Sequence, residues 1–313
     1  MKPVRLTLAQ TICRHLPPLF SQRLRPLIYS LSKAEVDDFE FIVPSQTGSP
    51  FCGRTSDFHA YPFSVHGYYD WRNWAVAIAV CKPGDTIIEI GGNIGTETVG
   101  FADIVGIRGK VLVFEPLPDN IARLSKNILL HKNNNIILSP YAVSDRCGKM
   151  IFVGPPKKNL SGLGHLLGVQ EEKTRSALEV EAVTIDAMQD VLGKAKIIVM
   201  DVEGAEYAVL QGAQDYLQTY DPYLILEASP KLLRRMGVTL ADLYSLLGTF
   251  DYEVYKIDRF GLSQPRIGDR VSAGNWLALP PAGLSSKDRI QRSIRKCGLL
   301  PCLPGINPLT RRV

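Results

Sequence analysis

Residues Thr86 to Gly95 read Thr-Ile-Ile-Glu-Ile-Gly-Gly-Asn-Ile-Gly. The first five form a short apolar run rich in β-branched side chains, which is typical of a strand buried on both faces. A turn signal, Lys82-Pro83-Gly84-Asp85, precedes the run, and three glycines follow it within five residues. Apolar residues then recur at helical spacing from Thr96 to Val105. Strand, glycine turn and helix together open a doubly wound α/β sheet, which binds ligands beyond the carboxyl ends of its strands.

The glycine turn departs from the dinucleotide fingerprint Gly-x-Gly-x-x-Gly, because Asn93 and Thr96 stand where its second and third glycines belong. Glu89, two residues before the turn, would repel a pyrophosphate and attract an ammonium group. Glu115 ends the next expected strand and could accept both ribose hydroxyls of NAD or of S-adenosylmethionine (SAM). Because SAM carries an ammonium, a sulfonium and no phosphate, the two acids together favour SAM.

A second group of acids follows the apolar run Lys196–Met200. Asp201-Val202-Glu203-Gly204-Ala205-Glu206 places three carboxylates where this fold carries its chemistry. We predict that Asp201 is a general base and that Glu203 orients the substrate or holds Asp201 in place. Two alternatives stay open: the carboxylates, Glu206 above all, could stabilise the start of the next helix, or they could hold a divalent cation. We expect no metal. On the substrate side we also place Glu206, His66 and Glu227, and we regard His66 and His165 as rival bases.

The remaining pattern alternates strands and helices. After strands Lys110–Phe114 and Ile136–Val143 come two expected pairs, Lys149–Val153 with Leu178–Ile185 and Tyr252–Ile257 with Asn275–Leu279. We expect an α/β fold with a doubly wound, mostly parallel seven-stranded sheet that ends in an antiparallel strand pair. Three further expectations concern other segments. We expect a strand over Glu35–Val43 and a mobile substrate flap over Gly154–Ala177. The aromatic segment Tyr61–Trp74 either covers the cofactor or packs on the sheet.

The basic charge lies at the two ends of the chain. The net charge is +5, with six basic residues and no acid in residues 1–33, and seven basic residues and one acid in residues 287–313. Residues 34–286 hold 23 basic and 30 acidic residues, which argues against a nucleic-acid groove. The ends could contact an anionic membrane or an acidic partner, or form solvated flanking helices. We therefore divide the chain into a basic N-terminal extension (1–65), an α/β domain that carries the expected SAM site (66–282) and a basic C-terminal tail (283–313).

No apolar run approaches the ~20 residues that span a bilayer, and Arg5, Gln10 and Arg14 interrupt any signal-peptide core. Six scattered cysteines without a Cys-x-x-Cys pair predict free thiols rather than disulfides or structural zinc. The expected location is cytoplasmic, with contact to the inner face of a membrane as an option. The sequence does not indicate the oligomeric state.

Several motifs in one order resemble FkbM-type methyltransferases, over roughly residues 66–280. They are Gly84–Gly95, Val113-Phe114-Glu115-Pro116, Ala142-Val143-Ser144-Asp145, Val183-Thr184-Ile185-Asp186 and Met200–Glu206, with Leu226-Glu227 after them. Two positions depart from the family pattern: Glu89 replaces an Asp, and Gly92 replaces an Ala. The resemblance implies a class I SAM-dependent methyltransferase that acts on a hydroxyl oxygen of a sugar or secondary metabolite.

The same resemblance assigns roles to individual residues. It implies that the methionine moiety is held by Glu89 and by the turn residues Gly91, Gly92, Asn93 and Gly95, and that Glu115 binds the ribose. It places Ala142, Val143 and Asp145 at the adenine. On the substrate side it places Asp201, Glu203 and Glu206. The acceptor is a small molecule or glycan, such as a glycolipid or polysaccharide precursor. Two other functions stay open: an NAD-dependent sugar oxidoreductase, and a SAM-binding module without catalysis.

Overall fold

A twisted eight-stranded sheet forms the centre of the computed structural model, which describes residues 2–157, 159–168, 177–268 and 271–310. The strand order is β13-β12-β14-β11-β10-β3-β4-β5. The β5-β4-β3-β10-β11 part is parallel, and β14, β12 and β13 add to it in antiparallel fashion. These strands are β3 (Thr86–Ile90), β4 (Lys110–Phe114), β5 (Ile136–Ser139), β10 (Ile197–Met200), β11 (Tyr223–Ala228), β12 (Glu253–Asp258), β13 (Gly261–Ser263) and β14 (Gly274–Leu279).

The expected α/β class and the terminal antiparallel pair, β12 with β14, are confirmed. The sheet has one strand more than the seven expected, because the three-residue strand β13 pairs with β12 at the edge. A strand of three residues leaves too little periodic pattern to be recognised in the sequence.

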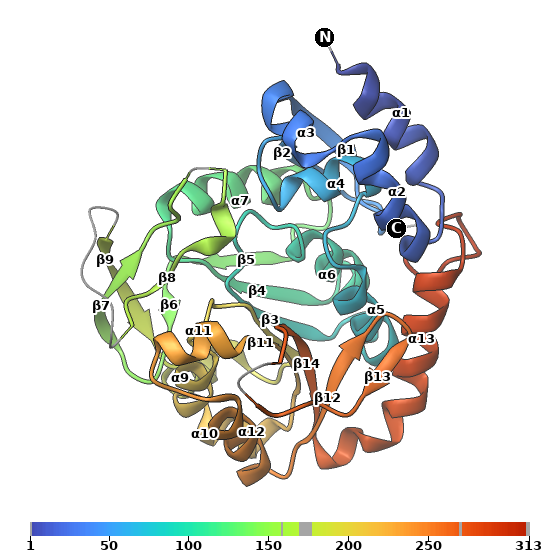
Figure 1. Ribbon diagram of the computed structural model, residues 1–313. Helices are drawn as coiled ribbons and strands as arrows, with labels where there is room; N and C mark the ends of the chain where they lie inside the picture. Colours follow the sequence, from blue (N-terminus) through green and yellow to red (C-terminus); the bar gives the residue numbers. More distant parts are fainter. Residues whose placement is uncertain (1, 158, 169–176, 269–270, 311–313) are drawn as a thin grey trace.

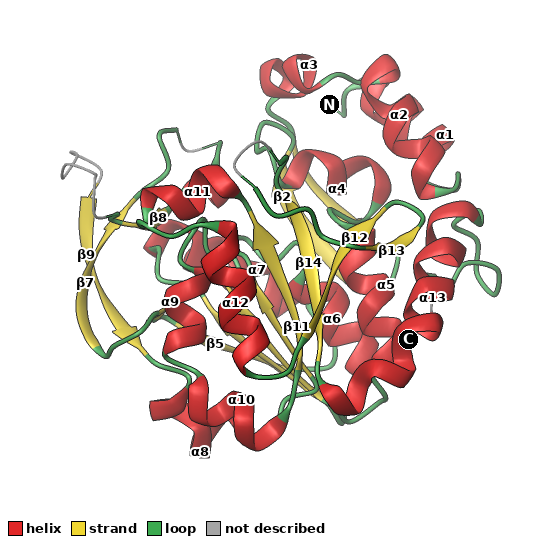
Figure 2. Cartoon of the chain, turned by 60° about the horizontal axis from the view of Figure 1, so that its bottom comes forward, coloured by secondary structure: helices red, strands yellow, loops and turns green. Residues whose placement is uncertain are grey.

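Helices cover both faces of this sheet (Figures 1 and 2). Neighbouring residues of one strand belong to opposite layers. Ile87 belongs to the core cluster that includes side chains of α5, α6 and α13, whereas Ile88 belongs to the cluster that includes side chains of α9, α10 and α12. The helices are α1 (Val4–Cys13), α2 (Pro18–Ile28), α3 (Leu31–Asp37), α4 (Ala60–His66), α5 (Trp71–Val80), α6 (Thr98–Val105), α7 (Pro118–Leu130), α8 (Gln189–Leu192), α9 (Glu206–Gln211), α10 (Gln214–Tyr220), α11 (Pro230–Arg235), α12 (Leu240–Thr249) and α13 (Lys287–Leu299).

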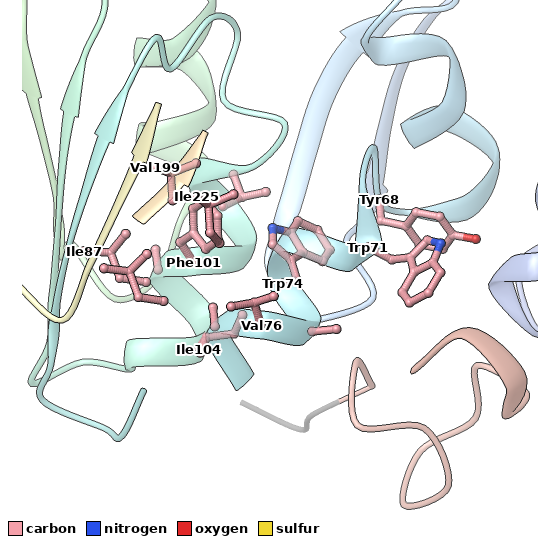
Figure 3. Close-up of a cluster of buried hydrophobic side chains, with 14 of the residues drawn as sticks. Tyr68, Trp71, Trp74, Val76, Ile87, Phe101, Ile104, Val199 and Ile225 are labelled. Carbon is pink, nitrogen blue, oxygen red and sulfur yellow. The ribbon is translucent and has the colours of Figure 1, made fainter. Parts of the chain in front are cut away.

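The aromatic segment packs mostly into the core, which is the second of its two expected roles. Tyr68, Trp71 and Trp74 are almost completely buried, and Figure 3 shows Trp74 of α5 beside Phe101 of α6. A side chain at Gly100 would place its Cβ 2.0 Å from Trp74 Cε2, so a glycine is required for this contact. Tyr69 is the exception, since it faces the carboxylates described below.

The N-terminal part packs against the sheet domain. Its strands β1 (Glu40–Pro44) and β2 (Pro50–Arg54) form a hairpin, and the loop between them binds the buried carboxylate of Asp103 in α6. Asp103 accepts hydrogen bonds from Ser49 N–H (2.9 Å) and the Thr47 hydroxyl (2.7 Å), and it lies 3.1 Å from His131 Nε2. The expected strand over Glu35–Val43 is wrong in its first half, because helix α3 continues to Asp37. The Ser30 side chain caps the start of α3 by accepting a hydrogen bond from Lys33 N–H, and Asp38 ends it in the left-handed conformation at φ 37°.

The C-terminal residues also pack on the domain. Helix α13 lies along α5 (Figure 1) and buries Ile290, Ile294 and Cys297, while the Ser293 hydroxyl donates to the Ala75 carbonyl at 2.7 Å. The basic side chains Arg289, Arg292, Arg295 and Lys296 lie on the other side of this helix.

A small four-stranded sheet lies beside β5, in the order β6-β9-β7-β8 (Figure 1). It contains β6 (Ala142–Val143), β7 (Gly148–Val153), β8 (His165–Leu166) and β9 (Ala177–Val183), and its antiparallel β7–β9 pair matches the expected one. The expected flap, 154–177, joins β7 to β9. Its residues 158 and 169–176 lie outside the described residues, so its mobility stays a prediction, whereas Ser161–Leu163 form a 3₁₀ turn.

Candidate active site

The direction of chain progression reverses between β3 and β10, which lie next to each other in the sheet. From β3 the chain moves outward through β4 to β5, and it later returns to β10 and moves the other way to β11. Such a reversal leaves a crevice at the carboxyl ends of the two strands. The glycine turn follows β3, and the acidic segment that begins with Asp201 follows β10.

The glycine turn is fixed by its closeness to the end of β10. Gly91 has φ +88°, and a Cβ at this position would lie 2.1 Å from the Asp201 carbonyl oxygen. Asn93 has φ +49°, a left-handed conformation that asparagine tolerates better than most residues. The N–H groups of Gly91 and Gly92 both donate to the Phe114 carbonyl, at 2.9 and 3.0 Å. Close packing of three strand ends therefore explains the glycines.

Glu115 is held directly beneath this turn. Its carboxylate accepts hydrogen bonds from Asn93 N–H (2.7 Å), Leu117 N–H (2.9 Å) and the Asn120 side-chain amide (3.3 Å). Burial raises the pKa of Glu115 to about 7, and the two N–H groups and the Asn120 amide oppose the rise. Helix α7 begins at Pro118, and Asn120 in its first turn bonds to Glu115 through its side chain.

A pocket opens beside Glu115 and extends across the ends of β3, β4 and β10. Its wall includes Asp201 and five of the predicted cofactor residues: Gly91, Asn93, Glu115, Ala142 and Val143. Apolar side chains complete the wall, and the sequence did not single them out: Phe114, Leu117, Phe152 and Leu166.

The 3₁₀ turn Ser161–Leu163 lies over this pocket. Ser161, Gly162 and Gly164 line it, and the Asn120 amide donates to the Ser161 carbonyl at 3.1 Å. The Asn93 side-chain oxygen and the Ser161 hydroxyl are buried without a hydrogen-bond partner. Both residues line the pocket, so a polar ligand in it could satisfy these atoms.

The N-terminal extension holds the 3₁₀ turn from the other side. The Phe58 N–H donates to the Asn159 carbonyl at 3.0 Å, and the buried ring of His59 lies between Gly162 and Tyr69. Burial lowers the pKa of His59 to about 4, and the nearby charge of Asp57 opposes the shift. His59 is therefore neutral at physiological pH. No local sequence motif marked this histidine, because its partners are distant in sequence.

Three carboxylates converge at the ends of β10 and β11. Asp201, Glu203 and Glu227 each place an oxygen within 4.8 Å of the others, among the residues that the structure describes. Asp201 is open to solvent although protein surrounds the crevice in which it lies. Burial raises its pKa to about 6, and the charge of Asp70 adds to the rise. Burial and the neighbouring acids raise the pKa of Glu203 to about 8 and that of Glu227 to about 9.

Residues just before α5 and α6 extend this acidic region, and the sequence pattern did not assign them to the site. Burial raises the pKa of Tyr69 well above its usual value, and the charge of Asp201 adds most to that rise. The Asp70 N–H donates to Glu97 at 3.0 Å. Burial raises the pKa of Glu97 far above the usual range, with Asp70 adding to it. Asp70 belongs to the aromatic segment Tyr61–Trp74, but only the fold brings it close to Asp201.

Other predicted residues lie farther from the pocket wall. Glu89 is 3% exposed under the glycine turn, where burial raises its pKa to about 8. Glu206 begins α9 and accepts from the Val202 and Gly204 N–H groups at 3.2 and 3.4 Å, in keeping with the helix-terminus alternative. Asp145 is exposed at the surface next to Arg146 and does not line the pocket.

Neither histidine that was considered as a base lies among the residues around Asp201. His66 is completely buried, 2.6 Å from the Ser21 hydroxyl and stacked on Tyr68. The substrate-side assignment of His66 is therefore replaced by a role in the core beneath α2. His165 lies in β8, with Nδ1 3.2 Å from the Leu163 carbonyl.

A doubly wound sheet with an acid after β4, a glycine turn after β3 and carboxylates after β10 has the architecture of a class I methyltransferase. The sequence model of the methyltransferase FkbM domain matches residues 89–254, just over half of the chain, and the chain belongs to this family. The cofactor is S-adenosyl-L-methionine, as the sequence predicted. The NAD alternative is therefore not retained.

Among curated proteins, the chain is 26% identical to the hexuronic acid methyltransferase AglP of Haloferax volcanii over 179 residues, which are 56% of this chain and 67% of AglP. A solved methyltransferase FkbM from Methylobacillus flagellatus is similar over 88% of this chain and 58% of that chain, with 13% identity and a TM-score of 0.43. Fibrillarin of Aeropyrum pernix, solved with bound S-adenosyl-L-methionine, is similar over 63% of this chain and 67% of its own, with 14% identity and a TM-score of 0.36.

Proposed function

We propose that this protein transfers a methyl group from SAM to a hydroxyl oxygen of a sugar, in a glycan, a glycolipid or polysaccharide precursor, or a secondary metabolite. The observation that carries the proposal is the position of Asp201, which is open to solvent at the end of β10 and borders the pocket beside Glu115. The sugar acceptor is supported by the relative AglP, a hexuronic acid methyltransferase.

The residues of the pocket suit the cofactor. Glu115 would accept hydrogen bonds from the ribose hydroxyls, and the apolar wall of Leu117, Val143 and Phe152 would enclose the adenine. Asn93 would meet the methionine moiety with its unsatisfied side-chain oxygen, as the sequence suggested. The buried carboxyl of Glu89 favours a positive charge nearby, which an ammonium or sulfonium group provides.

Asp201 is suited to act as the base. When bound, the cofactor supplies an electrophilic methyl group attached to a sulfonium sulfur. A sugar hydroxyl needs to lose its proton as it attacks, and a pKa of about 6 leaves the Asp201 carboxylate free to accept that proton at neutral pH. Positioning of the two reactants supplies a further part of the rate enhancement.

Glu203 and Glu227 have a different role in this proposal. Their pKa values of about 8 and about 9 keep them protonated at neutral pH, so they can donate hydrogen bonds to acceptor oxygens. Carboxyl groups whose pKa values are separated by their surroundings divide acid and base roles in this manner.

The basic ends of the chain add a second part to the proposal, contact with an anionic membrane surface. Val4, Leu8 and Ile12 lie one turn apart on the outward side of α1 and are 83%, 49% and 39% exposed. No helix among the described residues is long and apolar enough to cross a membrane. Cosedimentation with vesicles that contain anionic lipid tests this contact. Equal recovery with neutral vesicles would argue against it.

Methyl transfer from radiolabelled SAM to a panel of sugars and glycosides tests the proposed activity. We expect label in a base-stable methyl ether of the acceptor. Binding of SAM in calorimetry without transfer to any acceptor would favour the non-catalytic module instead.

A further inference from the structure

A second concave region lies at the edge of the sheet, formed by β12, β13, β14 and residues 264, 266 and 271–273 between β13 and β14. Two adjoining hollows of about 560 and 620 Å³ make up this region, and they share Lys256, Asp258, Ser263 and Gly274. Leu240 and Trp276 add an apolar wall to the first hollow. We call the two hollows together the Lys256 groove.

The groove is basic, in contrast to the crevice around Asp201. Its described lining residues include five cationic side chains and a single acid, Asp258: the cations are Arg72, Lys256, Arg259, Arg266 and Arg295. Arg72 is largely neutralised by Asp70. Lys256 Nζ lies 3.8 Å from Asp258, a loose and partly exposed pair that contributes little stability. Asp258 also accepts a hydrogen bond from the Ser263 hydroxyl, which further offsets its charge.

The groove lies next to the acceptor side of the crevice. Ala228, the residue after Glu227 in β11, lines the first hollow. In the sheet register, Leu226 pairs with Trp276, and Trp276 pairs with Lys256. Asp201 follows β10, so Lys256 in β12 is three strands away from it, about 14 Å between the backbones of β10 and β12 at the usual strand spacing. An acidic acceptor of one or two sugar units, together with the lengths of the Asp201 and Lys256 side chains, can bridge this separation.

We propose that the Lys256 groove binds an anionic group of the acceptor, a carboxylate or a phosphate, while the reacting hydroxyl lies at Asp201. The proposal rests on the proposed sugar methylation and names its substrate class, an acidic sugar. Lysine binds such groups as a compact point charge. Arg259 and Arg266 flank the groove and add to the positive field that attracts an anion.

The opposite charges of the Lys256 groove and of the crevice around Asp201 determine how an acidic acceptor is oriented. An anion placed beside Asp201 would be repelled by its ionised carboxylate, whereas an anion in the groove is attracted. A neutral acceptor gains nothing from the groove. An acidic acceptor is consequently bound in one orientation, with its anionic group on β12 and its neutral hydroxyl toward β10.

Calorimetry on the full chain saturated with S-adenosylhomocysteine tests the proposal through binding alone. The probes are methyl β-D-glucuronide, α-D-glucose 1-phosphate and the neutral methyl β-D-glucoside. We expect one or both anionic probes to bind at least tenfold more tightly than the glucoside, and the tighter of the two identifies the source of the negative charge. Raising the salt concentration should reduce this difference, because the groove is open to solvent.

The variant Lys256→Gln should remove most of the preference, with at least a tenfold loss for the anionic probe and less than a twofold change for the glucoside. Lys110→Gln, at the exposed opposite end of β4, is the matched control and should leave binding unchanged. Equal binding of the three probes, no binding, or equal behaviour of the two variants would overturn the inference. Preserved thermal unfolding shows that both variants are folded.

The same experiment separates the two proposals. Lys256-dependent binding of an anionic probe without methyl transfer to any sugar would leave the groove as an anion site and remove the proposed activity. Methyl transfer with equal rates on acidic and neutral sugars would leave the activity and overturn the groove.

Discussion

The ring of His59 lies directly against the backbone of Gly162. A Cβ at Gly162 would come within 2.1 Å of His59 Cε1. His59 belongs to the N-terminal part of the chain and lies outside residues 89–254, which match the family, whereas Gly162 lines the pocket. A residue outside the family core thus fixes the position of the turn that lies over the pocket.

Gly162→Ala should push this turn away from His59. Overpacking of this size costs about 1–3 kcal/mol, and we expect roughly tenfold weaker SAM binding with a smaller change in kcat. Calorimetry and steady-state kinetics with varied SAM measure the two effects. Gly248→Ala is the matched control, because a Cβ at that position in helix α12 would meet no other atom within 4 Å. Unchanged SAM affinity in Gly162→Ala would show that the contact with His59 does not matter for the pocket.

Glu115→Ala should weaken SAM binding by at least tenfold. The carboxylate is expected to bind the ribose and also orders the turn through Asn93 N–H, and hydrogen bonds to a charged group contribute about 1.5–3 kcal/mol each. Calorimetric titration with SAM measures the loss, and thermal unfolding shows whether the variant is folded. A folded variant with wild-type affinity would remove Glu115 from the cofactor site.

Asp201→Asn should lower kcat by about 10²–10⁴-fold, the usual contribution of a positioned base. In the wild-type protein kcat/KM should rise with pH through about 6 and then level off, because the base acts in its deprotonated form. The variant should lose this rise while its SAM affinity is preserved. Full turnover by the variant would contradict the assignment.

The ligand-free protein should become more stable as the pH is lowered from 9 to 6. The pKa values of Glu203 and Glu227, about 8 and about 9, lie above the ~4.3 of glutamate in an unfolded chain. The folded state therefore binds protons more tightly, and its stability falls as the pH rises between these values. Thermal unfolding across this range measures the effect. Bound SAM should flatten the dependence, because its positive charge favours the ionised acids. A melting temperature that rises toward pH 9 would contradict this prediction.

Dialysis against a chelator should leave methyl transfer unchanged. Asp201, Glu203 and Glu227 are close enough to bind one cation, but protonation of the two glutamates already reduces their mutual repulsion. Loss of activity on EDTA treatment, followed by recovery with added Mg²⁺, would show instead that these carboxylates hold a metal.

The sequence by itself determined the parallel core and the cofactor side of the pocket. Thr86–Ile90, the glycines after it and Glu115 follow each other along the chain, so local patterns suffice to place a strand, a turn and an acid at the next strand end. Asp201 and Glu227 could be placed for the same reason, since each comes directly after a short apolar run in the sequence.

Only the tertiary structure decided which other residues reach the site. His59, Tyr69, Asp70 and Glu97 carry no local motif and meet Asp201 or the pocket through packing between segments distant in sequence. His66, seven residues after His59, is instead buried beneath α2. Spacing along the chain cannot separate these two histidines, because the packing of the N-terminal extension determines the direction in which each ring points.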